Sequence, residues 1–394
     1  MIKLIAIVLI LFVFGACQNK SKQNNKSPIV FDLTRLSYNG ELKLSYLNAK
    51  NIEYIPLETN DLSLFGNISK LIVSDTDIYI KDFQQTILRF GSDGSFKNRI
   101  NRQGRGPKEY NDAYDFIVDP DSQDIYICSV SDKKIYSYSN QGKFLNCFPI
   151  PQGTLTIAFA YNNILCHRPY SMGNKESNLV LVSKNGHVIE QYPSYKYKTG
   201  LNSRFGYINE IIWFEFNDNL YIKDIHSDTV FLLNNNKQFI PQYVLNHGGK
   251  TITTEARNQF DSEEKFLTLG AKYSVEINVW RFGDYIISEF MYNDRLFIYA
   301  GGVNINKEHF GNLKHGIIND IDGGPNMNYN TIYYYNDNTM LSWVNASDLI
   351  IHVKSGKFKK SNPKYPERKK ALEKLASSLD ENDNPVLMLV KLKE

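Results

Sequence analysis

The chain has 394 residues and a formal net charge of +3, because 45 Lys and Arg nearly balance 42 Asp and Glu. This balance excludes a generally basic nucleic-acid-binding protein and a strongly acidic partner surface. Hydrophobic residues make up 42% and charged residues 22%, so the chain is globular rather than disordered. Tyr and Phe are abundant, at 26 and 23 residues, and both favour half-buried strands. We therefore expect a mostly β protein.

The first segment has the pattern of an export signal. Lys3 is the only charge before an apolar run, Leu4 to Phe14. A membrane-spanning helix needs about 20 residues, so this run is too short to cross a bilayer, but it suits a signal peptide. Gly15, Ala16 and Cys17 follow, and the triplet resembles the lipobox of bacterial lipoproteins. The resemblance implies a signal peptide over residues 1–16 and lipidation of Cys17. The alternative is an ordinary secretory signal with an incidental cysteine.

A repeated unit runs through the rest of the chain, and the search for internal repeats decides the fold. Each unit has one strand, a polar turn and a second strand. Three copies carry Tyr-Ile in the first of these strands: 77–82 with 87–90, 124–127 with 135–138, and 219–224 with 230–233. A tight turn and a further strand follow each pair. Such turns favour Asp-Gly and Asn-Gly, because both central residues tolerate positive φ.

The positions of these turns give the number of units. Taking the second turn residue as a marker, the turns fall at Gly94, Gly142, Gly186, Lys237, Gly302 and Gly356. The spacings run from 44 to 65 residues, and units of this size with about four short strands are typical of a β-propeller. We predict an all-β, six-bladed β-propeller over residues 29–394. The alternative, a β-sandwich, does not explain the recurring Tyr, Asp and Gly positions.

Two long spacings have a local cause. Residues 254–267 and 363–380 carry helical patterns, and we expect two short helical insertions on the propeller surface. Residues 385–392 are expected to form a final strand. A ring must also close, because open sheet edges are a liability. We predict that the early strand Ile52–Leu57 joins the sheet built from residues 326–394.

These features together resemble a known family. The stretch 52–58, the Tyr-Ile-x-Asp units, the ending 383–387 and the segment from Gln103 to Tyr110 are similar to the six-bladed β-propeller lipoproteins of Bacteroidota, relatives of NHL-repeat propellers. Lys108 stands where that family often has Gly. The family is defined by its fold, so the resemblance implies no shared activity.

The resemblance also bears on location. Residues 18–28 are polar and are expected, with the lipidated Cys17, to form a flexible tether over 17–28. Gln18 is not Asp, which by analogy with Gram-negative sorting favours the outer membrane. The tether has no acidic cluster, the signal for surface export in that phylum, so the periplasmic face is favoured and surface exposure stays open.

The glycine-rich segment 104–107 is not a phosphate loop, because it lacks the Lys-Ser/Thr ending and does not open a helix. One interpretation makes it a connection between blades that is stiffened by Pro107. The other places Arg105, Glu109 and Tyr110 at one mouth of the channel, in contact with a ligand.

No linear metal or catalytic motif is found. Asp115, Asp119, Asp121 and Asp124 lack the spacing of an EF-hand loop, and Asp119-Pro120-Asp121-Ser122 is a good turn sequence. The seven histidines form no His-Glu-x-x-His pattern; His352 falls in a predicted strand. Cys128, Cys147 and Cys166 are an odd number in apolar, strand-like runs, so at least one stays free and all are expected to be small buried side chains. We therefore expect neither a metal nor a cofactor.

Aromatic residues left over from the repeat are the remaining candidates. They cluster with basic residues between the third and fourth units, and tyrosines of this kind suit sugars and protein partners. The alternative is packing between blades. The binding candidates here are Tyr192, Tyr195, Tyr197, Arg204 and Tyr207.

Three functions follow as hypotheses. The first is a monomeric, membrane-anchored binding or scaffold lipoprotein whose partner is a glycan, a peptide or an envelope protein. The second is a hydrolase or lyase with a metal site at the mouth of the channel. The third is a sensor or assembly partner that docks another protein. None of the three involves nucleic acid.

Overall fold

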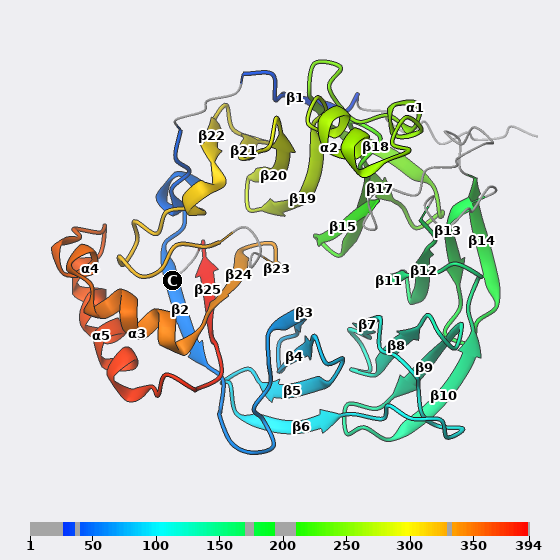
Figure 1. Ribbon diagram of the computed structural model, residues 1–394, viewed down its shortest axis with the longest axis horizontal. Coiled ribbons are helices and arrows are strands. Elements are labelled where there is room, and N and C mark those ends of the chain that lie inside the picture. Colours follow the sequence, from blue (N-terminus) through cyan, green and yellow to red (C-terminus); the bar gives the residue numbers. More distant parts are fainter. Residues whose placement is uncertain (1–26, 36–39, 170–176, 194–209, 329–332, 393–394) are drawn as a thin grey trace, which may run out of the picture.

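Six sheets of strands form a closed ring in the computed structural model (Figure 1). The structure describes residues 27–35, 40–169, 177–193, 210–328 and 333–392. The predicted signal peptide and most of the tether therefore lie outside the described residues. Each sheet is an antiparallel four-stranded blade, apart from one blade that has a fifth strand. This architecture confirms the predicted six-bladed β-propeller.

The first three blades follow the chain from the innermost strand outward. Blade 1 has β3 (Ile68–Val73), β4 (Asp77–Asp82), β5 (Ile87–Gly91) and β6 (Phe96–Ile100). Blade 2 has β7 (Asp115–Val118), β8 (Ile125–Ser129), β9 (Lys134–Tyr138) and β10 (Phe144–Pro149). Blade 3 has β11 (Thr156–Ala160), β12 (Asn163–His167), β13 (Ser177–Val182) and β14 (Val188–Pro193).

Blade 4 is the blade with the fifth strand. It has β15 (Ile211–Phe216), β16 (Asn219–Asp224), β17 (Thr229–Leu233) and β18 (Phe239–Asn246), and β1 (Ile29–Asp32) pairs in parallel with the outer strand β18. Blade 5 has β19 (Val275–Phe282), β20 (Tyr285–Tyr292), β21 (Arg295–Gly302) and β22 (Glu308–Asn312).

Blade 6 closes the ring with strands from both ends of the chain. Its innermost strands are β23 (Tyr333–Asn336) and β24 (Thr339–Val344), followed by β25 (Val386–Lys391) and then β2 (Asn51–Pro56). β2 pairs antiparallel with β25, with Ile52 opposite Val390. The predicted closure by residues 52–57 and the predicted final strand are thus both confirmed.

The expected helical insertions are present, and the second is longer than predicted. The first holds α1 (Thr254–Arg257) and α2 (Glu263–Gly270), and the second holds the 3₁₀ turn η5 (Pro366–Arg368) and α5 (Lys369–Ser378). Helices α3 (Ala346–Lys354) and α4 (Gly356–Lys360) lie between β24 and β25, and short 3₁₀ turns span Leu44–Leu47 (η1) and Leu313–His315 (η3). Among the described residues, none of the helices combines the length and apolar character needed to cross a membrane.

The prediction of a hairpin turn at Ser355-Gly356 is wrong. The Ser355 hydroxyl accepts a hydrogen bond from the Phe358 backbone N–H, so Ser355 caps the start of α4. His352 accordingly lies in helix α3 rather than in a strand. The marker at Gly302 is also displaced: it is the last residue of β21, and the turn lies at residues 303–307. The blade count is unchanged, because β23, β24, β25 and β2 still supply a sixth sheet.

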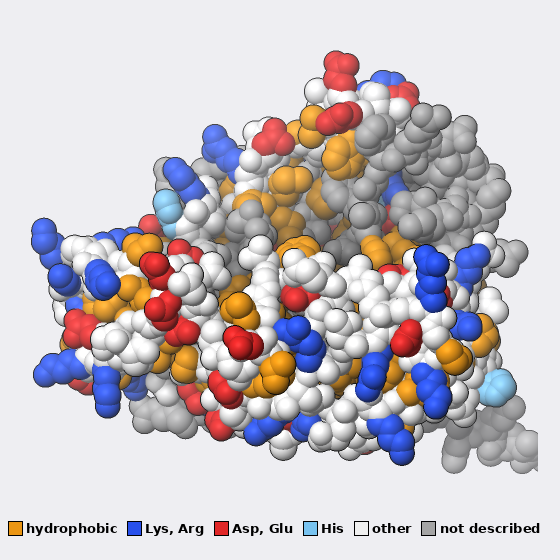
Figure 2. Space-filling model, turned by 60° about the horizontal axis from the view of Figure 1, so that its bottom comes forward, with side chains coloured by type: hydrophobic (Ala, Val, Ile, Leu, Met, Phe, Trp, Pro, Cys, Tyr) orange, Lys and Arg blue, Asp and Glu red, His pale blue; other side chains and the backbone are white. Residues whose placement is uncertain are grey.

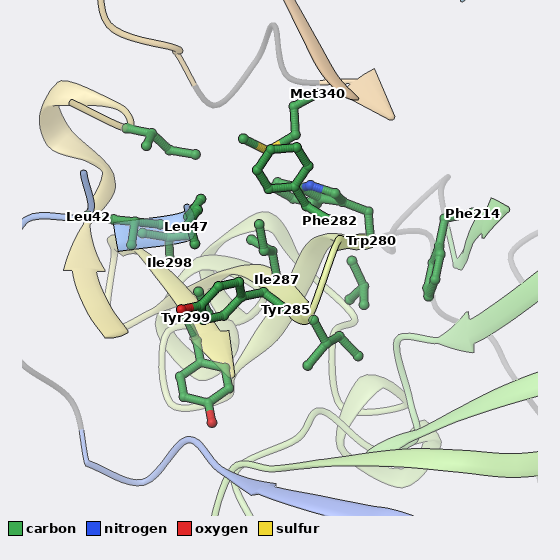
Figure 3. Close-up of a cluster of buried hydrophobic side chains, with 14 of the residues drawn as sticks. Leu42, Leu47, Phe214, Trp280, Phe282, Tyr285, Ile287, Ile298, Tyr299 and Met340 are labelled. Carbon is green, nitrogen blue, oxygen red and sulfur yellow. The ribbon is translucent and has the colours of Figure 1, made fainter. Parts of the chain in front are cut away.

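The core lies between neighbouring blades. A large buried cluster joins blades 4, 5 and 6 to the N-terminal segment that crosses them, with Trp280, Phe282 and Tyr285 at its centre (Figure 3). The repeated tyrosines pack at the blade junctions, as expected. Tyr79 is fully buried beside blade 2, and Tyr126 packs its ring against Phe159 of blade 3. Tyr221 stacks on Phe214 of its own blade at a centroid distance of 5.0 Å, within the cluster that joins blades 4, 5 and 6.

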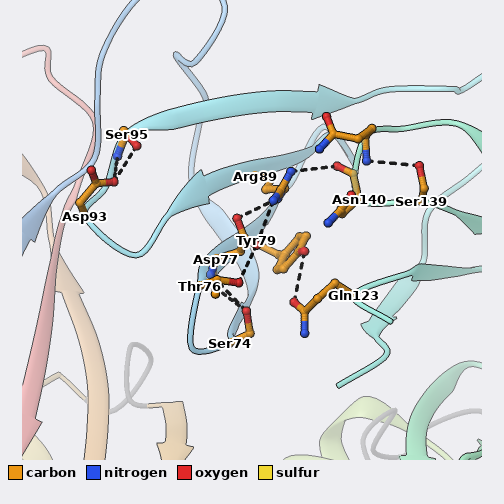
Figure 4. A network of polar contacts seen from close by, with 11 residues as sticks. Ser74, Thr76, Asp77, Tyr79, Arg89, Asp93, Ser95, Gln123, Ser139 and Asn140 are labelled. Atoms are coloured by element: carbon orange, nitrogen blue, oxygen red, sulfur yellow. Dashed lines mark hydrogen bonds and ion pairs between the residues drawn. The ribbon is translucent and has the colours of Figure 1, made fainter. Parts of the chain in front are cut away.

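Polar contacts also join blades. Arg89 forms a two-point ion pair with Asp77, with Nε–Oδ1 and Nη2–Oδ2 distances of 2.8 and 3.0 Å, and its Nη1 donates to the backbone oxygen of Asn140 in blade 2 (Figure 4). Two-point pairs of this kind fix the guanidinium plane as well as its position. The ring is therefore a rigid support for the loops at its ends.

Candidate functional site

At one end of the ring, polar contacts link the innermost strands of blades 1, 2 and 3. The innermost strands of blades 1 to 5 all start at this end, which we call the upper face. The alternation of antiparallel strands also places there the connections between blades and the turns between second and third strands. Lys70 near the start of β3 pairs with Asp115 at the start of β7, with a Nζ–Oδ1 distance of 2.6 Å. Asp115 Oδ2 in turn accepts from the Ile157 backbone N–H near the start of β11.

The glycine-rich segment is an inter-blade connection on this face. Glu109 Oε2 accepts from the Gly106 backbone N–H at 2.8 Å and closes the loop on itself. A Cβ on Gly104 would lie 2.1 Å from the same carboxylate oxygen, so a side chain there would displace Glu109 from this hydrogen bond. Tyr110 is fully buried against Tyr136 and Tyr138, and its hydroxyl donates to the Ile100 carbonyl. Arg105 is exposed.

The structure describes only one residue of the predicted aromatic cluster, Tyr192. Tyr192 is 9% exposed, and its ring packs on Phe239 of blade 4 at a centroid distance of 4.6 Å. Burial raises the pKa of Tyr192 to about 12. The structure thus places Tyr192 in the packing between blades 3 and 4. Four binding candidates of this cluster, and the lipidation candidate, lie outside the described residues: Tyr195, Tyr197, Arg204, Tyr207 and Cys17.

The structure exposes apolar side chains that the sequence did not single out. They lie on three neighbouring segments around blade 1. Two hydrogen bonds join the turn after β4 to its neighbours. The Phe83 backbone N–H donates to the Asn67 carbonyl, and the Ala113 backbone N–H donates to the Gln85 side-chain oxygen. We call their large exposed side chains the blade 1 surface: Leu62 (69% exposed), Leu64 (53%), Phe83 (68%) and Tyr114 (38%).

A buried lysine supports this surface from below. Lys81 is 8% exposed, and its ammonium group donates to the carbonyls of Ala113 and Tyr114. Desolvation lowers the pKa of Lys81, and the nearby Asp115 carboxylate partly opposes the effect. The lysine thereby fixes the backbone that carries Tyr114 against blade 1. Phe83 and Tyr114 are therefore held in place by hydrogen bonds, and exposed apolar groups held in this way are typical of interaction sites.

A second polar cluster lies under α1 and α2, between blades 4 and 5. Arg257 from α1 pairs with Glu210, and both side chains are buried. His226 lies beside Arg257, and its Nδ1 is 3.2 Å from the Ile252 carbonyl oxygen. Desolvation lowers the pKa of His226. Buried pairs of this kind contribute little net stability but are costly to break, so the cluster fixes the helical insertion on the ring.

Next to it, three side chains have the composition of a catalytic triad but the wrong order. His247 Nε2 lies 2.6 Å from Glu276 Oε1, and the Ser288 hydroxyl donates to Glu276 Oε2 at 2.7 Å. In nucleophilic catalysis the histidine stands between the hydroxyl and the carboxylate, so that it can take the hydroxyl proton. Here the carboxylate stands in the middle, and all three groups are buried. The cluster is therefore a structural polar network.

The metal-site hypothesis needs three or more ligands that converge on one point. Within the described ranges, no three His, Cys, Asp or Glu side chains gather closely enough to hold a metal ion. Cys128, Cys147 and Cys166 are free thiols, and the first and last are buried.

The fold and these sites define the class of protein, a six-bladed β-propeller with an apolar surface on blade 1. The chain belongs to the family described as Domain of unknown function (DUF4934), whose model matches residues 28–391. No curated protein matches it.

Two solved structures share the fold. A Bacteroides fragilis structure described as that of a "putative exported protein" has 16% identity and a TM-score of 0.72, and covers 93% of this chain and 100% of its own. A Bacteroides vulgatus member of the duf4221 family has 12% identity and a TM-score of 0.54, and covers 90% of this chain and 98% of its own. Identities this low show a common fold alone.

Proposed function

We propose that this protein is a lipid-anchored propeller of the bacterial outer membrane that binds a peptide or envelope protein through the blade 1 surface. The observation that carries the proposal is the exposure of Phe83 and Tyr114 on hydrogen-bonded segments. Aromatic side chains that are fixed in this way lose little entropy on binding and often dominate contact energies. The lipid anchor would be Cys17, with the tether over residues 17–28.

Several further observations support the location. The lipobox resemblance motivates the anchor, and the two similar structures described above come from Bacteroides, one of them described as exported. Gln18 and the absence of an acidic cluster in the tether favour the periplasmic face of the outer membrane. We propose also that the protein is one of the NHL-related propeller lipoproteins of Bacteroidota.

A photo-crosslinking experiment in the host cell tests the binding site. A benzophenone amino acid replaces Phe83 in one strain and Tyr114 in a second, and Lys237, exposed on a turn of blade 4, in a control strain. The proposal predicts adducts with the same partner from Phe83 and Tyr114, and none from Lys237. Protease and glycosidase treatment of the adduct separates a protein partner from a glycan.

The outcomes are distinct. An adduct that disappears with protease supports a peptide or protein partner, whereas one that disappears with glycosidase alone shows a glycan and contradicts the proposed partner class. Equal adducts from all three positions, or none from Phe83 and Tyr114, would contradict the site.

A further inference from the structure

The second helical insertion, between β24 and β25, concentrates positive charge. Residues 354–374 run from the end of α3 into α5 and contain nine Lys or Arg and two Glu. This segment therefore has a net charge of +7, whereas the whole chain has +3, so the remaining residues together carry −4. Such an asymmetry within one chain indicates an anionic partner for the basic part.

Most of these cations are exposed. We call the exposed ones the basic insertion surface: Lys354, Lys357, Lys359, Lys360, Lys364, Lys370 and Lys374. Within the described ranges, none of their ammonium groups forms an ion pair with a carboxylate. Figure 2 shows Lys and Arg side chains crowded at the left end of the molecule, where α3, α4 and α5 lie in Figure 1, and spread from the top to the bottom of that end. Their charge is therefore available to a ligand.

The two other cations of the segment hold the insertion in place. The Lys369 ammonium group donates to the carbonyls of Phe358 and Ser361 at the end of α4, with distances of 2.7 and 3.0 Å. Arg368 donates to the Lys50 carbonyl at 2.7 Å, just before β2. The Phe358 side chain is fully buried in an apolar cluster with residues of α3 and α5. The basic insertion surface therefore lies on a fixed support.

Helix stability does not explain where these lysines stand. Lys357 and Lys360 are three residues apart in α4, and Lys370 and Lys374 are four apart in α5, so like charges are neighbours on both helices. Such pairs destabilise a helix. Helix α5 also begins with two lysines and has no acidic residue in its first turn, although positive charge is unfavourable at the start of a helix. A sequence that breaks local rules in this way indicates a function for the charge.

The composition of the insertion selects among anionic partners. Specific protein interfaces are enriched in Arg and aromatic side chains and depleted in Lys, whereas eight of the nine cations here are Lys. A bilayer is held best where apolar side chains lie beside basic ones, but Ile351 is the one large hydrophobic side chain that is exposed among the described residues 345–385. Flexible lysines that offer separate point charges suit a charged chain, which can follow a curved surface.

We propose that the basic insertion surface binds an acidic polysaccharide, a chain that carries carboxylate or phosphate groups along its length. A nucleic acid has the same charge pattern, and the choice of the polysaccharide rests on the export that the proposed function assumes. The site is separate from the blade 1 surface and does not need the lipid at Cys17. Each contact is an exposed charge pair, so binding depends on several lysines at once and weakens as salt is added.

The test measures the binding of fluorescently labelled polygalacturonate to the full protein in a neutral detergent, by fluorescence anisotropy. The insertion variant removes four charges of the basic insertion surface: Lys357→Gln, Lys359→Gln, Lys360→Gln and Lys370→Gln. The control variant removes four exposed charges elsewhere: Lys97→Gln, Lys134→Gln, Lys143→Gln and Lys272→Gln. The two variants have the same net charge and differ only in where the charges are removed.

We expect the insertion variant to bind at least about tenfold more weakly than the parent, and the control variant to stay within about twofold of it. The affinity of the parent should also fall at least about fivefold between about 50 and 200 mM salt. Equal losses in the two variants, no binding of polygalacturonate, or equally tight binding of neutral dextran would overturn the inference.

Two other ligands test the class of partner. Tighter binding of DNA, or of vesicles that contain phosphatidylglycerol, with the same loss in the insertion variant, would overturn the polysaccharide as the partner. The crosslinks from Phe83 and Tyr114 test the proposed function separately, so a failure there and a failure here are distinguishable.

Discussion

The junction that closes the ring offers a sharp test at a single glycine. Gly94 lies in the turn of blade 1 with φ of +84°, and a Cβ there would lie 2.2 Å from the Pro56 carbonyl oxygen. Pro56 is the last residue of β2, the strand that completes blade 6. The backbone N–H of the nearby Glu58 donates to the Gly94 carbonyl at 2.9 Å. The change Gly94→Ala therefore strains the backbone and also pushes blade 1 away from blade 6.

The magnitude follows from two contributions. A non-glycine residue at positive φ costs about 1–2 kcal/mol. Loss of the backbone hydrogen bond adds about 0.5–1.5 kcal/mol. The sum is about 1.5–3.5 kcal/mol, and more if β2 shifts. Gly249 is the matched control, because its φ is +76° and nothing lies within 4 Å of its Cβ position, so Gly249→Ala should cost only the backbone contribution.

Urea unfolding followed by circular dichroism measures both variants against the parent protein. The account expects Gly94→Ala to lower the free energy of unfolding by about 0.5–1.5 kcal/mol more than Gly249→Ala. Equal losses for the two variants would refute the reasoning, because they would show that the contact between blades 1 and 6 contributes nothing.

Two further predictions concern buried groups. Glu289 is fully buried, and burial raises its pKa well above the usual value, an effect that a hydrogen bond with Asn278 partly opposes. Because the folded-state pKa exceeds the unfolded one, the stability of the parent should fall by about 1.4 kcal/mol per pH unit relative to Glu289→Gln as the pH rises from about 4.3 towards the folded pKa. Urea unfolding of both proteins across that range should show this slope in the difference between their free energies of unfolding; a flat difference would count against the prediction. The second prediction concerns the thiols: maleimide should modify the half-buried Cys147 of the native protein first. Burial hides Cys128 and Cys166 and raises their pKa, that of Cys166 to about 12. Equal rates of modification for all three thiols would contradict the prediction.

The repeat made the architecture predictable, because turn chemistry is local. Asp93-Gly94, Gln141-Gly142 and Asn185-Gly186 each form the expected turn, with their glycines at positive φ. The prediction failed at Ser355-Gly356 because serine is common both in turns and at the first position of a helix. Phe358 packs against α3 and α5, and this packing favours the helix. The turn residues of a repeat thus predict blades well, except where an insertion replaces a hairpin.

The candidate site was less predictable, because exposure is a tertiary property. Phe83 follows a strand of the repeat, so its sequence context favours packing between blades, yet the turn leaves it 68% exposed. One signal was available: an aromatic residue in the polar turn Asp82-Phe83-Gln84-Gln85 is unusual. Tyr110 shows the converse, since a candidate for ligand contact is fully buried beneath its own loop.

The lipid anchor is the central claim, because the proposed location depends on it. Mass spectrometry of the N-terminal peptide from the membrane fraction tests it most directly, with Cys17→Ser expressed in parallel. The account predicts a peptide that begins at Cys17 and carries a thioether-linked diacylglycerol and an N-terminal acyl group, and the absence of this species from the variant. An unmodified Cys17, or a mature chain that begins at another residue in the soluble fraction, would contradict it.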